Sequence, residues 1–303
     1  YTREIKKIKE NSKKNLKKNN DDDSDDENIS DLIDEDIDKI ESVQSEIADN
    51  IGMLLKTHKN LSNDIINQLI QTIIPNYIQS KNTFEIKMGL YIADDLIEFI
   101  GQDMLGDVTW DLMYKIITDL VVKDDVSTRQ AAAYGIGNFA KFTTKNFDNY
   151  SKGLIDAIYN AMNIKNNEKN NDDEEDENNS FGMAFDNMVS ALGKIINYQF
   201  NSNVVQAGIN ELVNKWIMNL PILYDETEQE EQHEWMVDIF VMKRNLINES
   251  SYSHYFESLT KIYETKSSND KINEKIKKLF DDIVKKEESI KNIINENNNV
   301  KAL

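Results

Sequence analysis

The chain has 303 residues, a net charge of −20 and no cysteine. The absence of cysteine excludes disulfides, thiol nucleophiles and thiolate metal sites, and it fits an intracellular protein. A strongly acidic surface repels nucleic acid and anionic lipid and attracts basic proteins, so we expect protein partners rather than nucleic acid or a membrane. Because the sequence starts with Tyr1 rather than Met, we expect a piece of a longer polypeptide.

Residues 1–29 are polar and divided by charge. The first twenty residues carry eight basic side chains against the two acidic ones of Glu4 and Glu10, and the acidic run Asp21–Glu27 follows. Like charges this dense resist burial in a core. The sequence therefore predicts a charged, disordered segment over 1–29.

From residue 30 onward the apolar residues recur at helical spacing, and no strand pattern competes. Only two prolines interrupt the chain, and Pro75 should bend or end its helix because it has no N–H to donate. The spacing predicts a helix over 30–57, followed by the helix pairs 61–79 with 83–101, 109–122 with 126–143, 147–163 with 180–199, 203–219 with 226–246, and 252–265 with 269–287.

Two of these helices resemble each other. Arg129-Gln-Ala-Ala-Ala-Tyr-Gly-Ile-Gly137 aligns with Ile86-Lys-Met-Gly-Leu-Tyr-Ile-Ala-Asp94, so that Tyr134 matches Tyr91. A period just above forty residues, with two amphipathic helices in each unit, is typical of HEAT repeats. Such units stack because one unit cannot bury its apolar face alone. The sequence therefore predicts an all-α solenoid of about five to six HEAT repeats over 30–303.

The next repeat is longer than the others. Asn187-Met-Val-Ser-Ala-Leu-Gly-Lys194 aligns with the Arg129 helix only after an extra stretch, which matches the low-complexity segment 165–179. This segment contains the acidic run Asp172–Glu177, and we interpret it as a disordered acidic insertion. The run could attract basic partners at long range or be a passive insertion. A calcium site is not expected, because the D-x-[DN]-x-[DN]-G loop is missing.

Four motifs follow one another along the chain, and their order and spacing matter for the comparison below. They are Gly89–Glu98, Arg129–Gly137, Ser190–Ile195, and Trp216–Pro221 followed by Asp225. With these motifs, residues 30 to 245 resemble the importin-β family of nuclear transport receptors, most closely the C-terminal repeats of its importin-5 (karyopherin-β3) branch. The resemblance implies a receptor that shuttles between cytoplasm and nucleus. It implies basic cargo, release of that cargo by Ran-GTP, and binding of Phe-Gly nucleoporins by the full-length protein.

The second helix of each HEAT pair lines the concave side of the array. On helix 83–101, Tyr91, Asp94, Asp95 and Glu98 share a face away from the apolar stripe. Aromatic rings next to carboxylates can hold lysine-rich segments. We therefore predict a cargo-facing stripe, with an ordinary solvated helix face as the alternative. Its further members are Tyr134, Asn138, Asp186, Asn187, Glu234 and Asp238.

Asp124, Asp125 and Arg129 lie at a predicted turn between paired helices. An Asp between the helices that faces an Arg further on is typical of HEAT arrays, where a ladder of ion pairs and N-caps braces successive turns. A contact with cargo or Ran is the alternative, and we favour the bracing role.

Other residues give no support for an enzyme. Gly135–Ala140 matches a dinucleotide-binding fingerprint by letter, but it lies well inside a predicted helix, where the backbone N–H groups are already bonded. His58, His233 and His254 have no metal-ligand spacing. We therefore predict no catalysis, cofactor or metal.

The three tryptophans, Trp110, Trp216 and Trp235, are predicted to be core or packing residues. Alternatively, these tryptophans help to form grooves between helix pairs on the convex side. Receptors of the importin-β family bind Phe-Gly repeats in such grooves. Two other functions remain open for the whole chain. One is a HEAT scaffold of another assembly, of the phosphatase or condensin type, and the other is a chaperone of histones or ribosomal proteins.

Overall fold

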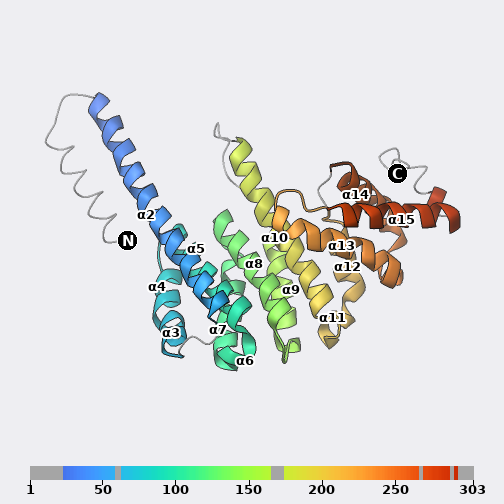
Figure 1. Cartoon of the computed structure of the whole chain (residues 1–303), viewed down its shortest axis with the longest axis horizontal. Coiled ribbons are helices and arrows are strands. Elements are labelled where there is room, and N and C mark those ends of the chain that lie inside the picture. Colours follow the sequence, from blue (N-terminus) through green and yellow to red (C-terminus); the bar gives the residue numbers. More distant parts are fainter. Residues whose placement is uncertain (1–22, 59–62, 165–173, 266–268, 287–289, 293–303) are drawn as a thin grey trace. The chain divides into compact units, whose positions relative to one another are not determined.

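The computed structural model describes residues 23–58, 63–164, 174–265, 269–286 and 290–292. These residues form helices and turns, with no β-strand among them, which confirms the predicted all-α solenoid of HEAT type (Figure 1). None of the helices in these ranges combines the length and apolar character that a bilayer crossing requires. The chain divides into two compact units, Tyr1–Ile100 and Gly101–Leu303.

In unit 1, α5 (Thr83–Asp95) packs against both α4 (Ile74–Ile78) and the long helix α2 (Asp23–Thr57). Apolar residues of α2 such as Leu55 are fully buried there, and Gly52 of α2 brings the helices close together. A Cβ atom on Gly52 would lie 2.3 Å from the Asp95 carboxylate. The elements of this unit are α2 (Asp23–Thr57), α3 (Asn63–Gln68), η1 (Leu69–Ile73), α4 (Ile74–Ile78), α5 (Thr83–Asp95) and η2 (Leu96–Ile100).

In unit 1 one predicted boundary differs from the structure, and one predicted irregularity agrees with it. Helix α2 starts at Asp23, so residues 23–29 are helical instead of disordered, and the rest of the predicted disordered segment lies outside the described residues. Acidic residues in a first helical turn interact favourably with the helix dipole, which accounts for this start. The predicted irregularity at Pro75 is confirmed, because a π-helical turn over Leu69–Ile73 precedes it.

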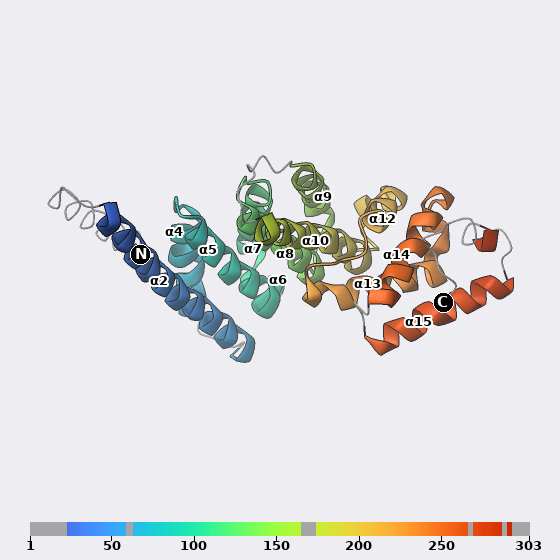
Figure 2. The same cartoon turned by 90° about the horizontal axis from the view of Figure 1, so that it is seen from above.

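Unit 2 contains two rows of helices. In one row α8, α10, α13 and α15 contact one another in turn, and in the other α7 contacts α9 and α9 contacts α11. Figure 2 shows α9, α12 and α14 on one side of unit 2 and α10, α13 and α15 on the other. Its elements are α6 (Gly101–Leu105), α7 (Asp107–Leu120), α8 (Val126–Phe142), α9 (Asp148–Met162), α10 (Glu174–Tyr198), α11 (Asn203–Ala207), α12 (Ile209–Ile217), α13 (Glu226–Lys243), η3 (Arg244–Leu246), η4 (Glu249–Ser251), α14 (Tyr252–Thr265) and α15 (Asp270–Lys286).

Most predicted helix boundaries agree closely with these. Helix α10 starts at Glu174, inside the predicted insertion 165–179, of which residues 165–173 lie outside the described part. The predicted helix 203–219 is two helices, because the backbone leaves helical geometry at Gly208. Gly135–Ala140 lies within α8, as predicted, and the small residue Gly137 leaves room for the Lys194 side chain of α10.

Three helices of the row α8, α10, α13 and α15 begin with the same kind of hydrogen bond. Asp125 accepts the backbone N–H of Thr128, Asp225 accepts those of Thr227 and Glu228, and Asn269 accepts that of Ile272. Each is an N-cap, which satisfies N–H groups that have no partner inside the helix. In unit 1, Asn82 caps α5 in the same way.

Candidate functional site

The predicted cargo-facing residues of unit 1 differ in exposure. Tyr91 is 38% exposed, whereas Asp94 is buried and Asp95 and Glu98 are half-buried. Burial, then the neighbouring carboxylates of Glu98 and Asp49, raise the pKa of Asp95 to about 7. Tyr91, Asp95 and Glu98 therefore remain accessible to a partner, and the side chain of Asp94 does not.

On α8, Tyr134 is half-buried and Asn138 is buried. The ammonium of Lys194 lies 5.2 Å from the centre of the Tyr134 ring, so this ring already contacts an internal cation. Asn138 would need a local rearrangement before it could touch a partner.

Asp186 and Asn187 of α10 are buried and bind the repeat that follows. One carboxylate oxygen of Asp186 accepts the backbone N–H groups of Leu223, Tyr224 and Asp225 at 2.6–3.1 Å. Asn187 donates to the Asp225 carboxylate at 2.7 Å. Burial raises the pKa of Asp186, although these backbone N–H groups oppose the increase. Both side chains act as internal clamps in this structure, so the expectation that they face cargo does not fit their position.

Glu234 and Asp238 of α13 lie next to lysines of α15. Lys275 bonds Glu234 at 2.7 Å and Asp238 at 2.8 Å, and Lys271 bonds Glu234 at 2.8 Å. The hydrogen bonds from Lys271 and Lys275 lower the pKa of Glu234. A basic partner would therefore compete with these lysines.

The three residues of the predicted ladder make contacts inside their own repeat. Asp125 caps α8, and Arg129, itself buried, donates to the backbone carbonyls of Lys123 and Asp124 at 2.8 and 2.7 Å. These bonds join the end of α7 to the start of α8, and a ladder that runs from one repeat to the next stays a prediction.

Trp110 and Trp216 are fully buried, as predicted, and Trp235 is half-buried. His233 is also buried, while His254 lies 3.1 Å from the carbonyl oxygen of Leu220. Among the described residues, no group of three His, Asp or Glu side chains is arranged to hold a metal ion.

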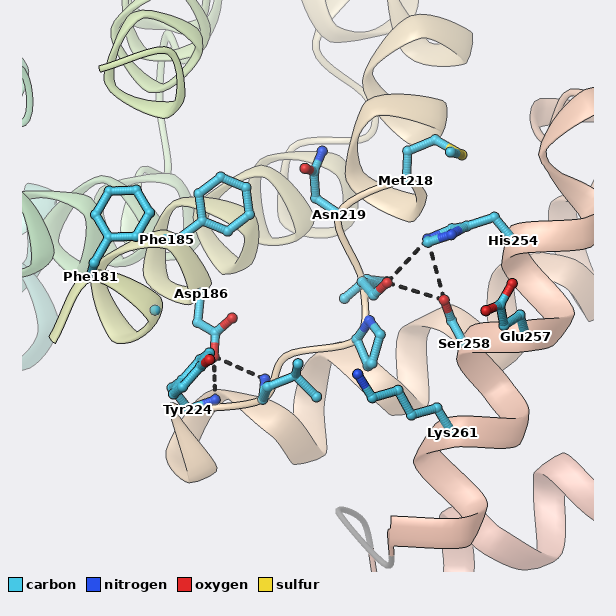
Figure 3. Close-up of a pocket in the computed structure, with 14 residues that line it drawn as sticks. Phe181, Phe185, Asp186, Met218, Asn219, Tyr224, His254, Glu257, Ser258 and Lys261 are labelled. Carbon is cyan, nitrogen blue, oxygen red and sulfur yellow. Dashed lines mark hydrogen bonds between the residues drawn. The ribbon is translucent and has the colours of Figure 1, made fainter. Parts of the chain in front are cut away.

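One hollow in unit 2 was not predicted from the sequence. It has a volume of about 680 Å³ and lies in unit 2 between residues 181–186 of α10, the segment 218–225 and α14 (Figure 3). Phe181 and Phe185 lie on one side, and Met218, Leu223 and Tyr224 expose large apolar side chains around it.

Hydrogen bonds hold the segment 218–225 in place on both sides of this pocket. Asp186 binds it through Leu223, Tyr224 and Asp225, and Ser258 of α14 donates to the Leu220 carbonyl at 3.1 Å (Figure 3). The pocket is thus a hollow of mixed polarity, in which aromatic and aliphatic side chains face polar ones such as Glu257 and Lys261, and its apolar part can take an apolar or aromatic side chain. Residues from three elements form it, and the only sequence signal was the Trp216–Pro221 motif.

The comparisons with known proteins concern the fold. No protein-family model matches the chain, and no curated protein matches its sequence. The structure superposes on that of Kap121p, solved bound to Nup53p, with a TM-score of 0.57 over 84% of this chain. The chain has an importin-β-like HEAT fold. At 19% identity this likeness concerns the fold alone, and the aligned part is 23% of Kap121p.

Proposed function

We propose that the chain is the C-terminal part of a nuclear import receptor of the importin-5 branch, and that it acts by binding rather than by catalysis. It binds basic proteins, which the complete receptor carries through the nuclear pore and releases when Ran-GTP binds. The protein shuttles between cytoplasm and nucleus. The HEAT fold shared with Kap121p and the net charge of −20 support this proposal.

The observation that carries the proposal is the crowding of carboxyl groups beside Tyr91. The pKa of Asp95 is raised to about 7. Burial is the larger cause, and the nearby carboxylates of Glu98 and Asp49 add to it. An ammonium or guanidinium group from a partner would relieve this repulsion, and the exposed Tyr91 ring would add a cation–π contact. The site therefore favours lysine- or arginine-rich segments.

Charge reversal tests this site. We expect Asp95→Lys/Glu98→Lys to weaken the binding of a fluorescein-labelled lysine-rich peptide on the order of ten-fold, measured by anisotropy. The matched control is Asp119→Lys/Glu211→Lys, which changes two exposed acidic residues elsewhere by the same total charge. An equal loss in both variants would mean that net charge, and not this site, attracts the peptide.

The pocket between α10, the segment 218–225 and α14 is our proposed site for the phenylalanine of a Phe-Gly nucleoporin repeat. Its size and exposed apolar rim support this role. Met218→Glu/Leu223→Glu should abolish binding of a Phe-Gly peptide, while Val241→Glu, a substitution at an exposed apolar residue of α13, should not.

Control by Ran requires the longer receptor. A basic client bound by that receptor should be released on addition of Ran-GTP. Client binding that Ran-GTP leaves unchanged would instead favour a chaperone of histones or ribosomal proteins.

A further inference from the structure

A second hollow of unit 2 lies between the end of α10 and one face of α13. It has a volume of about 340 Å³. The rings of Tyr198 and Trp235 both line it, with their centres 5.4 Å apart and their planes at 80° to each other. Trp235 shares its face of α13 with Glu231 and Asp238, which precede and follow it at helical spacing. Perpendicular ring walls with carboxylates beside them suit an organic cation.

Ammonium groups of the chain itself already contact rings of this hollow. The Lys243 ammonium lies 3.1 Å from the centre of the Phe200 ring, and that of Lys141 lies 5.2 Å from the centre of the Tyr198 ring. A ring face attracts a cation because its π-electrons carry negative charge. Burial lowers the pKa of Lys243, so its charged form becomes more stable when the side chain moves out to water. The hollow therefore holds a cation that a better-suited one can displace.

The charges around the hollow also favour a cation. Its lining has two carboxylates, those of Glu231 and Asp238, against the one ammonium of Lys243, which leaves a net charge of −1. Lys141 and Lys275 offset part of the negative charge, because they pair with Glu231 at 3.7 Å and with Asp238 at 2.8 Å. The ring faces therefore supply the main attraction, and the net charge of −20 draws cations toward the chain.

Hydrogen bonding selects the kind of cation. Tyr198 donates to Glu231 at 2.6 Å, and Lys275 donates to the two oxygens of Asp238 at 2.8 and 3.1 Å. An ordinary lysine brings three N–H donors, and a donor that loses its water without finding an acceptor costs free energy. A trimethylated lysine keeps its positive charge and has no donor to satisfy. The rings and Ile239 offer its methyl groups an apolar surface.

We propose that this aromatic hollow (Tyr198, Phe200 and Trp235, with Glu231 beside them) binds a trimethylated lysine in a basic segment of a partner protein. The Lys243 side chain moves out to solvent when the methylated side chain enters. This inference deepens the proposed function and rests on it only in that the partner is a basic protein. The hollow shares no residue with the site in unit 1 or with the proposed Phe-Gly pocket.

The natural tryptophans allow binding to be located. Trp110 and Trp216 are fully buried, and Trp235 is half-buried in the hollow. The probe is a short peptide of glycine and serine with one trimethyllysine, followed by ¹⁹F NMR of the 303-residue chain labelled with 5-fluorotryptophan. We expect the Trp235 signal, assigned by its loss in Trp235→Phe, to shift on titration while the other two stay.

Two comparison peptides test the chemistry. One has unmodified lysine, and the other has a neutral side chain of the same shape, with a tert-butyl group in place of the trimethylammonium. Each should bind at least about ten-fold more weakly than the trimethyllysine peptide. Equal affinity for either comparison peptide, or a Trp235 signal that does not respond to trimethyllysine, overturns the proposal.

Three variants test the residues. Tyr198→Leu removes one ring wall and should weaken binding about ten-fold, while Tyr263→Leu, at a half-buried tyrosine of α14 outside the hollow, is the matched control and should leave it unchanged. Lys243→Met frees the Phe200 ring and should raise the affinity about three-fold. An unchanged or lower affinity in Lys243→Met overturns the proposal. Unshifted signals of the two buried tryptophans report that each variant folds.

A last variant separates this inference from the proposed function. Asp95→Lys/Glu98→Lys alters the site in unit 1 and should leave the affinity for the trimethyllysine peptide within about two-fold, since distant sites act independently. Loss of binding in that variant, with binding kept in Tyr198→Leu, would place the ligand in unit 1 and overturn the inference. Failure of the lysine-rich peptide to bind unit 1 would instead count against the proposed function alone.

Discussion

The Lys194 ammonium and the Glu228 carboxylate lie 2.8 Å apart, with side chains only 5% and 6% exposed. The pair joins α10 to α13, two successive helices of one row, and Ser190 of α10 also donates to the same carboxylate. A buried ion pair stabilises little relative to apolar residues of the same shape, but losing one partner leaves an uncompensated charge.

We therefore predict that Lys194→Met destabilises unit 2 by about 3–5 kcal/mol. Lys194→Met/Glu228→Met should be less destabilising than Lys194→Met alone. Urea denaturation followed by tryptophan fluorescence measures both, because Trp110, Trp216 and Trp235 all lie in unit 2. A double variant that is no more stable than the single one would contradict this account.

Asp95→Asn should change how unit 1 responds to pH. The folded pKa of Asp95 is about 7 and the ordinary value is 3.8, so the folded state binds the proton more tightly than the unfolded state. Stability is then lost as pH rises from about 4 through about 7, and is flat above that range. With allowance for solvent screening of a half-buried side chain, the loss is about 1–2 kcal/mol.

Hydrogen exchange of α2 and α5 amides is the suitable readout, since no tryptophan lies in unit 1. Corrected for the intrinsic exchange rate, protection in the natural chain should be greater at pH 5 than at pH 8, and Asp95→Asn should remove most of that difference. An unchanged pH dependence in the variant would assign it to another group.

Asp186→Ala should loosen the segment 218–225. The substitution leaves three backbone N–H groups without their acceptor, and we expect a cost of about 2–4 kcal/mol. Asp186→Asn should cost less, because its amide oxygen can still accept. Faster hydrogen exchange at residues 223–225 would report the opening, with the exposed Lys261→Ala as the control. Equal exchange in Asp186→Ala and the control would show that the clamp is dispensable.

Gly193→Ala adds a single Cβ atom where α10 packs against α13, and so tests how closely the two helices fit. The added Cβ would lie 2.0 Å from Gln232 Oε1 and 2.7 Å from Trp216 Nε1, and these two atoms are bonded to each other at 2.9 Å. We expect destabilisation of about 1–3 kcal/mol and a shift in tryptophan emission, despite the helix preference of alanine. Gly208→Ala, with open space around the site, should change neither quantity.

The helical repeat could be predicted because amphipathic spacing and a period of 43 residues are local properties of the sequence. Helix α8, for example, was expected over 126–143 and is found over Val126–Phe142. The burial of Asp94, Asn138, Asp186 and Asn187 could not be predicted in this way. Helical spacing identifies the residues that share a face, but the packing of the neighbouring elements decides whether that face meets solvent.

The apolar pocket shows the same limit more strongly. Phe185, Leu223 and His254 belong to three elements, and no spacing within one helix relates them. The Leu220 carbonyl, which Ser258 and His254 approach, becomes part of the site only when α14 folds against the segment 218–225. Such a site depends on the stacking of successive repeats.

The capping residues have a consequence for chain length. The capping residues Asp225 and Asn269 are 44 positions apart. The position 44 residues before Asp225 is Phe181, which lies inside α10 and does not cap its start. The position of α10 is fixed instead further along, by Asp186, Ser190 and Lys194 bonding to the following repeat. All of these bonds lie beyond Phe181, so none of them depends on the number of residues that precede it in the chain.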